Sequence, residues 1–287
     1  MEIIIAKEAG FCFGVKRAVD GAYNETQNKD KKIYCLGEIV HNNNVINQLK
    51  KEGITFAQSI DEIKEDNIKL IIRAHGIDRK IYNVAKKRNF EVIDFTCPLV
   101  KKTHDIAEKY HKIGYYIFLI GSKNHPEIIG TSSHCGKNYS VIESEEELRK
   151  EINNINSLKI EKLLVIVQTT FSKSKFALFE KIIRETINPK INLLINNTIC
   201  NATGNRQLET EKLSKMVDLL IVVGGKNSSN TKKLYEVASK NCKSLLVENY
   251  EDIDLKFVKD FDKIGLVSGA STPIEIVNEI ADKLKLL

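Results

Sequence analysis

The chain has 287 residues, 42% of them hydrophobic and 29% charged, which is typical of a globular protein with two or three compact lobes. Lysines mixed with acidic residues give a net charge of +6, and this unclustered pattern disfavours nucleic-acid binding. No apolar stretch could span a membrane, and residues 1–8 do not resemble a signal peptide. We therefore expect a cytoplasmic protein without nucleic-acid or membrane partners. Its six cysteines favour metal or redox chemistry over a disulfide framework.

Short β-branched runs alternate with amphipathic helical patterns, which predicts an α/β fold with mainly parallel sheets. Each of nine predicted strands leads to a polar residue or a cysteine. In chain order these strand-end residues are Cys12, His41, His75, Cys97, His125, Thr169, Cys200, Ser228 and Ser271. The order repeats as two polar residues followed by one cysteine: His41, His75 and Cys97, then His125, Thr169 and Cys200, then Ser228 and Ser271 with Cys12 from the N-terminus.

This order defines three pseudo-repeated α/β lobes. We expect residues 14–97 to form the first lobe, 98–200 the second, and 201–287 together with 1–13 the third. Pseudo-repeats of this length favour a ring-like arrangement. Because ligands of open parallel sheets collect at the carboxyl ends of the strands, the nine strand ends are expected to surround one cavity.

Three cysteines sit in matched local settings, namely Cys12, Cys97 and Cys200. The other three read as ordinary core or helix-end thiols: Cys35, Cys135 and Cys242. For any single cysteine, buried packing is the simpler interpretation. Three separate thiolates without a CxxC pair favour one 4Fe-4S cluster over structural zinc. Such a cluster keeps one open iron, which can polarise a substrate oxygen, unless a histidine is its fourth ligand.

The remaining strand-end residues suit a small anion. Histidines and the hydroxyl and amide groups of Ser228, Ser229, Asn230 and Ser271 can bind phosphate oxygens, especially near helix N-termini. The alternative is structural, with surface or core histidines and serines that cap helices. Since neither a P-loop nor a GxGxxG motif is present, we do not expect ATP or NAD(P)H to bind in the usual ways.

A candidate proton donor follows one of the histidines in the sequence His125-Pro126-Glu127. A carboxyl group near a bound anion tends to have a raised pKa, so it can protonate a leaving oxygen. Thr169 or Thr170 could relay that proton. The alternative is that Glu127 only stabilises the N-terminus of a helix.

Taken together, these motifs resemble the 4-hydroxy-3-methylbut-2-enyl diphosphate reductase family. The resemblance runs over essentially the whole chain. The matching stretches are residues 10–15, 37–42, 73–76, 96–100, 125–127, 168–170, 198–200, 205–207, 228–230 and 269–271. Departures at Asn201, Gly204 and Thr272 flank assigned positions and concern helix packing more than chemistry.

The resemblance implies a trefoil of three α/β lobes around a central cluster cavity. It implies that Cys12, Cys97 and Cys200 bind the 4Fe-4S cluster, that Glu127 delivers a proton and that Thr169 lies close to the substrate hydroxyl. The implied diphosphate pocket consists of His41, His75, His125, Ser228, Ser229, Asn230 and Ser271.

The implied reaction is reductive dehydroxylation of (E)-4-hydroxy-3-methylbut-2-enyl diphosphate to isopentenyl and dimethylallyl diphosphate. Its two electrons must come from outside the chain, because no second cluster or flavin motif is visible. A ferredoxin or flavodoxin is the expected donor. Two alternatives stay open at this stage. One is a redox-neutral dehydratase with an open iron, and the other is a non-catalytic metal-dependent sensor.

Overall fold

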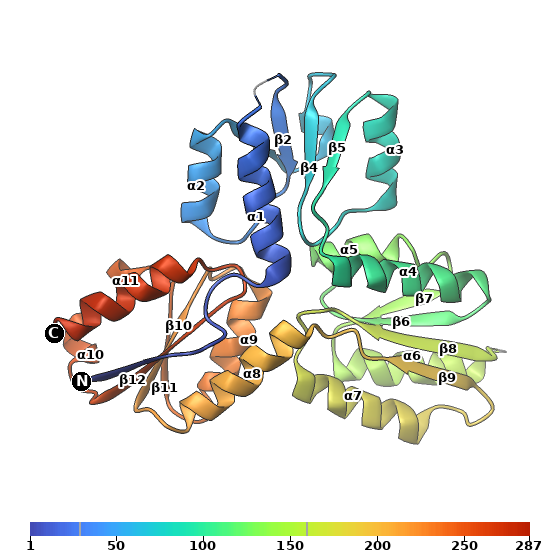
Figure 1. Cartoon of the computed structure of the whole chain (residues 1–287). Coiled ribbons are helices and arrows are strands. Elements are labelled where there is room, and N and C mark those ends of the chain that lie inside the picture. The colour runs from blue at the N-terminus through green and yellow to red at the C-terminus, as the bar shows by residue number, and fades with distance from the viewer. Residues whose placement is uncertain (29, 159) are drawn as a thin grey trace. The chain divides into compact units, whose positions relative to one another are not determined.

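The structure, a computed structural model, describes residues 1–28, 30–158 and 160–287. In these residues the strands form three separate four-stranded sheets, and every strand pairing is parallel. The predicted α/β fold with parallel sheets is therefore confirmed (Figure 1). None of the described helices is both long and apolar enough to cross a membrane.

The three sheets share one strand order. The first has the order β3-β2-β4-β5, the second β7-β6-β8-β9 and the third, read from its other edge, β11-β10-β12-β1. The strands are β1 (Glu2–Ile5), β2 (Ile33–Leu36), β3 (Ile54–Ala57), β4 (Lys69–Ile72), β5 (Glu91–Asp94), β6 (Tyr116–Ile120), β7 (Tyr139–Ile142), β8 (Lys162–Val167), β9 (Asn192–Asn196), β10 (Leu219–Val223), β11 (Lys243–Val247) and β12 (Lys263–Ser268). The strands that precede Cys12, Cys97 and Cys200 in the chain are β1, β5 and β9. Each is an edge strand of its sheet, so the predicted repeat is confirmed at the level of topology.

Helices connect the strands. They are α1 (Phe13–Thr26), α2 (Asn43–Lys51), α3 (Arg79–Lys87), α4 (Pro98–Lys112), α5 (Pro126–Ser132), α6 (Glu145–Ser157), α7 (Lys173–Thr186), α8 (Asn201–Ser214), α9 (Ser229–Ala238), α10 (Leu255–Val258) and α11 (Ile274–Lys285), with short 3₁₀ helices at Ile60–Glu62 and Tyr250–Asp252. Several begin at side-chain caps that satisfy free backbone N–H groups, such as Asn42 before α2 and Ser144 before α6.

Alternation along the strands supplies apolar side chains to both faces of a sheet. In β10, Leu219, Ile221 and Val223 pack into a core with α11, whereas Leu220 and Val222 pack into another with α8 and α9. A fully buried side chain of this kind contributes roughly 1.5–3 kcal/mol of hydrophobic free energy. Helices on both faces explain why these strands are continuous apolar runs in the sequence.

The chain folds into two compact units. The first consists of Met1–Asn24, Glu38–Gly53 and Asn201–Leu287, and it holds the sheet that contains β1. The second consists of Glu25–Gly37 and Ile54–Cys200, and it holds the other two sheets. The three-lobe boundaries given above, 14–97, 98–200 and 201–287 with 1–13, stay a prediction.

Candidate active site

The three matched cysteines share a backbone interaction. In each case the cysteine N–H donates to the carbonyl oxygen of a residue two positions beyond the end of the neighbouring strand. The N···O distances are 3.1 Å for Cys12 to Ala270, 2.9 Å for Cys97 to Ala74 and 2.9 Å for Cys200 to Thr169. The fold thus places each cysteine at the carboxyl end of its sheet, beside the polar end of the adjacent strand.

Each of these cysteines also stands directly before a helix. Helix α1 begins after Cys12, α4 after Cys97 and α8 after Cys200. The N-terminus of a helix stabilises negative charge, so it favours a thiolate or an anionic cluster bound to one. All three cysteines are partly exposed, which distinguishes them from core cysteines.

Cys35 and Cys135 show the contrast. Both are buried, and burial raises the pKa of each thiol to about 12. The interpretation of Cys35 as a core residue of a strand is therefore confirmed. A thiol with so high a pKa is a poor metal ligand at neutral pH, whereas three separate thiols at helix N-termini fit an iron–sulfur cluster.

Cys12 belongs to the first unit, and Cys97 and Cys200 belong to the second. Within the described ranges, no group of three or more His, Cys, Asp or Glu side chains is arranged to hold a metal ion. A cluster shared by the three cysteines stays a prediction.

In the second unit Glu127 is almost completely buried, with 1% exposure, in the first turn of α5. Its Oε1 accepts a hydrogen bond of 2.7 Å from the Thr169 N–H, and its Oε2 accepts one of 2.8 Å from Thr169 Oγ1. Burial raises the pKa of Glu127 to about 7, although both bonds from Thr169 act in the opposite direction. This carboxyl group can therefore hold and release a proton near neutral pH.

Thr170 has a different partner. Its Oγ1 accepts a bond of 2.7 Å from Gln168 Nε2, and Gln168 Oε1 in turn accepts one of 3.1 Å from the Ser122 N–H. Of the two candidate relay residues, Thr169 is the one in contact with Glu127.

Two of the predicted histidines lie beside this acid. His125 is the N-cap of α5, and its Nδ1 accepts a hydrogen bond of 3.2 Å from the Glu127 N–H. An accepting Nδ1 leaves the proton of the neutral ring on Nε2. The rings of His75 and His125 meet edge to face, with 5.2 Å between their centroids. The second unit therefore gathers His75, His125, Glu127 and Thr169 at the ends of its strands.

In the first unit His41 lies against the β10–α9 turn. A Cβ atom on Gly225 would approach the His41 carbonyl oxygen to 2.1 Å, so only glycine permits this contact. His41 Nδ1 lies 3.2 Å from Glu38 Oε2, a partner that the sequence motifs did not assign.

Ser228 caps α9, since its Oγ accepts a hydrogen bond of 3.3 Å from the Thr231 N–H. Ser229 is the first residue of that helix and is half-buried. The capping interpretation is thus confirmed for Ser228, but it is wrong for Ser271, because the residue that precedes α11 is Pro273.

The first unit also contains buried polar atoms without partners. Across the described residues, neither Asn230 Nδ2 and Oδ1 nor Ser271 Oγ has a hydrogen bond, although both residues are over nine-tenths buried. Leaving such a group unpaired costs about 1–3 kcal/mol, so native structures rarely do so without a ligand, ion or water. Donors of this kind fit phosphate oxygens.

Two residues of α8 hold the loop before Cys12, and sequence reasoning gave them no role. Arg206, 5% exposed, donates from Nη2 to the Gly10 carbonyl oxygen over 2.7 Å. The Glu209 carboxylate accepts the N–H groups of Lys7 and Glu8 at 2.7 and 3.0 Å. Arg206 lies in the stretch 205–207, which matches the family, whereas Glu209 lies in no matching stretch.

Known proteins resemble this chain over its whole length. The family described as LytB protein matches residues 3–285. A protein of Thermoanaerobacter sp. (strain X514) is 43% identical over 292 residues, which cover 100% of this chain and 98% of that protein. A protein of Clostridioides difficile (strain 630) is 36% identical, with 100% of both chains covered. Both are named 4-hydroxy-3-methylbut-2-enyl diphosphate reductase.

Two solved structures are similar as well. The E-1-hydroxy-2-methyl-but-2-enyl-4-diphosphate reductase from Plasmodium falciparum has a TM-score of 0.90 and 34% identity, over 99% of this chain and 88% of that one. The (E)-4-hydroxy-3-methyl-but-2-enyl diphosphate reductase described as the terminal enzyme of the non-mevalonate pathway has a TM-score of 0.72 and 34% identity, with 100% of both chains covered. The chain therefore belongs to the LytB family, whose enzymes are iron–sulfur proteins.

Proposed function

We propose that this chain reduces (E)-4-hydroxy-3-methylbut-2-enyl diphosphate to isopentenyl and dimethylallyl diphosphate. Its place as the reductase of the non-mevalonate pathway follows from relatives that carry this name at 36–43% identity over the full length. The observation that carries the chemistry is the position of Thr169. This residue donates to Glu127 through its N–H and hydroxyl, and its carbonyl oxygen accepts the Cys200 N–H at 2.9 Å.

We propose that Cys12, Cys97 and Cys200 hold one 4Fe-4S cluster, which leaves one iron without a protein ligand. When bound, this group supplies single electrons and a Lewis-acid position for the substrate oxygen. The chain contributes three thiolates at helix N-termini, where the backbone offsets part of their negative charge. A ferredoxin or flavodoxin in the cytoplasm is the proposed electron donor.

The diphosphate is proposed to bind to residues of both units. In the first unit these are His41, Ser228, Ser229, Asn230 and Ser271, and in the second they are His75 and His125. The support comes from the unpaired Asn230 amide and Ser271 hydroxyl, which a phosphate group would satisfy. No charged lysine or arginine is required in this set, because neutral donors in a buried position bind anions strongly.

Glu127 is proposed as the proton donor. Replacing the substrate hydroxyl by hydrogen consumes two electrons and two protons and releases one water molecule. With a pKa raised to about 7, Glu127 keeps a proton that can pass to the departing hydroxyl oxygen. The Thr169 hydroxyl, 2.8 Å from Glu127 Oε2, can donate to the carboxylate that remains.

A reductant-dependence assay on the anaerobically purified protein tests this function. Product formation from the allylic diphosphate should require dithionite or a reduced ferredoxin, and both five-carbon diphosphates should appear. Loss of water without any reductant would instead identify a redox-neutral dehydratase. Tight binding of the diphosphate without turnover, with or without reductant, would identify a sensor.

A further inference from the structure

His104 lies in α4, two turns after Cys97, and is only 7% exposed. The Cε1–Nε2 edge of its ring faces two glycines of the second unit. A Cβ on Gly76 would lie 3.0 Å from His104 Cε1, and a Cβ on Gly130 would lie 3.5 Å from His104 Nε2. Gly76 directly follows His75, and Gly130 lies in α5 one turn after Glu127. One side chain therefore touches both elements that carry the candidate acid and its histidine neighbours.

The other side of the ring stacks on His134, with 4.5 Å between centroids and 17° between planes. His134 is fixed in turn, because its Nδ1 lies 3.3 Å from Glu108 Oε2, which also pairs with Arg79 at 3.2 Å. Burial lowers the pKa of His104 to about 4 and lowers that of His134 as well. His104 is therefore held by stacking on His134 as well as by its packing against the two glycines.

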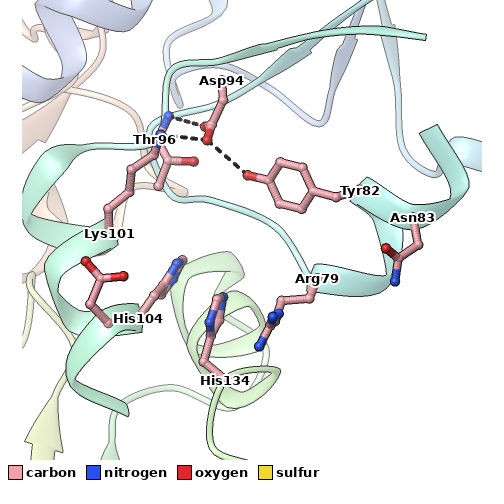
Figure 2. Close-up of a pocket in the computed structure, with 9 residues that line it drawn as sticks. Arg79, Tyr82, Asn83, Asp94, Thr96, Lys101, His104 and His134 are labelled. Atoms are coloured by element: carbon pink, nitrogen blue, oxygen red, sulfur yellow. Dashed lines mark hydrogen bonds and ion pairs between the residues drawn. The ribbon is translucent and has the colours of Figure 1, made fainter. Parts of the chain in front are cut away.

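The stack borders a cavity of about 400 Å³, and Figure 2 shows both imidazole rings from α4 and from the turn after α5 beside it. Two charged groups along its wall, Lys101 and Asp94, are paired with each other. Lys101 Nζ lies 2.7 Å from Asp94 Oδ2, and the Tyr82 hydroxyl donates to Asp94 over 3.2 Å. In contrast, His104 Nε2 is buried and has no hydrogen bond to any described residue. Among the described residues, His104 Nε2 is therefore held by packing and not by a hydrogen bond.

We propose that His104 is a positioning residue for the reaction: its ring sets the spacing between the His75 loop and α5, and so places His75, His125 and Glu127. The inference rests on the proposed function. A misplacement of about 1 Å in such groups is sufficient to reduce catalysis substantially. His104 touches none of the proposed reacting groups itself, so its effect reaches them through Gly76 and Gly130.

The test is the variant His104→Ala in the full-length, cluster-loaded protein. We expect kcat to fall and the Kd of the diphosphate substrate, measured by anaerobic calorimetry, to rise, each by about tenfold. Because the removed ring borders a cavity, added imidazole should restore much of both quantities. His104→Phe keeps a ring against the two glycines, so it should retain most of the affinity for the diphosphate substrate.

His111→Ala is the matched control, since His111 lies on the same helix and contacts the Gly136 turn instead. It should bind and turn over substrate like the wild type. Wild-type values in His104→Ala, or a loss that imidazole does not restore, would overturn the positioning role alone. If the wild type itself neither bound nor reduced the substrate, the proposed function would fail first and this inference with it.

Discussion

The candidate functional groups of the two units differ in how they are paired. In the second unit the Glu127 carboxyl group accepts two hydrogen bonds from Thr169, and the Glu127 N–H donates to His125 Nδ1. In the first unit Asn230 and Ser271 are also buried, but their side chains have no hydrogen-bond partner among the described residues. Under the proposed function, the acid would be preorganised before substrate binds, whereas Asn230 and Ser271 would gain their partners from the substrate.

This division has a physical reason. A proton donor must have a defined pKa and position throughout the reaction, so its hydrogen bonds are built into the fold. A diphosphate group brings many acceptor oxygens. Any protein acceptor already bonded to these donors would compete with the diphosphate for them. The proposed function therefore predicts that the unpaired groups lower the stability of the free protein and raise its affinity for the ligand.

The largest effect is expected at Glu127. Glu127→Gln keeps the size and burial of the side chain but removes its proton, so kcat should fall by about 100- to 10,000-fold. Turnover under excess dithionite measures this loss, and the absorption spectrum of the cluster should stay unchanged.

Glu146→Gln is the control, because Glu146 also lies in the first turn of a helix but is exposed. Its activity should equal that of the wild type. Near-normal turnover of Glu127→Gln would contradict the assignment of Glu127 as the acid.

A smaller effect is expected at Ser271. Ser271→Ala removes a buried hydroxyl that has no hydrogen bond to a described residue, so the free energy of unfolding should not fall and should rise by up to about 1–3 kcal/mol. The Kd of the substrate should rise by about tenfold, as for one lost hydrogen bond to a charged group. Parallel calorimetry and urea unfolding measure the two quantities. A clear loss of stability with unchanged substrate affinity would contradict the view that Ser271 serves binding and not stability.

Thr169→Val should give the opposite pattern. It removes the Oγ1 bond to Glu127, so the free energy of unfolding should fall by about 1–2 kcal/mol. This bond lowers the pKa of Glu127, and its loss should raise that pKa above the present value of about 7. If protonated Glu127 is the active form, as proposed, the basic limb of the pH–rate profile should move to higher pH. An unchanged limb would show that the carboxyl group does not control it.

Much of the site was predictable because it lies at the ends of buried parallel strands. All five residues of β10 are buried, and such a run is visible in the sequence without any alternation. The matched cysteines and histidines then followed from their offsets to these strands. The shared N–H bond of the three cysteines gives the repeat a structural basis that residue identities alone lack.

Other features were not predictable. The strands β3, β7 and β11 were missed, because they are short edge strands with partly exposed or polar residues. The bond between Thr169 and Glu127 joins residues 42 positions apart, and its geometry depends on packing between α5 and β8. The packing of His104 against Gly76 and Gly130 has no sequence signature, since the two glycines belong to different elements.

The most direct test of the account is the iron and sulfide content of cysteine variants purified without oxygen. We expect about four irons per chain in the wild type and in Cys242→Ser, the control for an ordinary thiol. Cys12→Ser, Cys97→Ser and Cys200→Ser should each lose most of that iron, because all three thiolates are proposed to hold one cluster. Full iron content in any one of these three variants would contradict the shared cluster and the reduction proposed to depend on it.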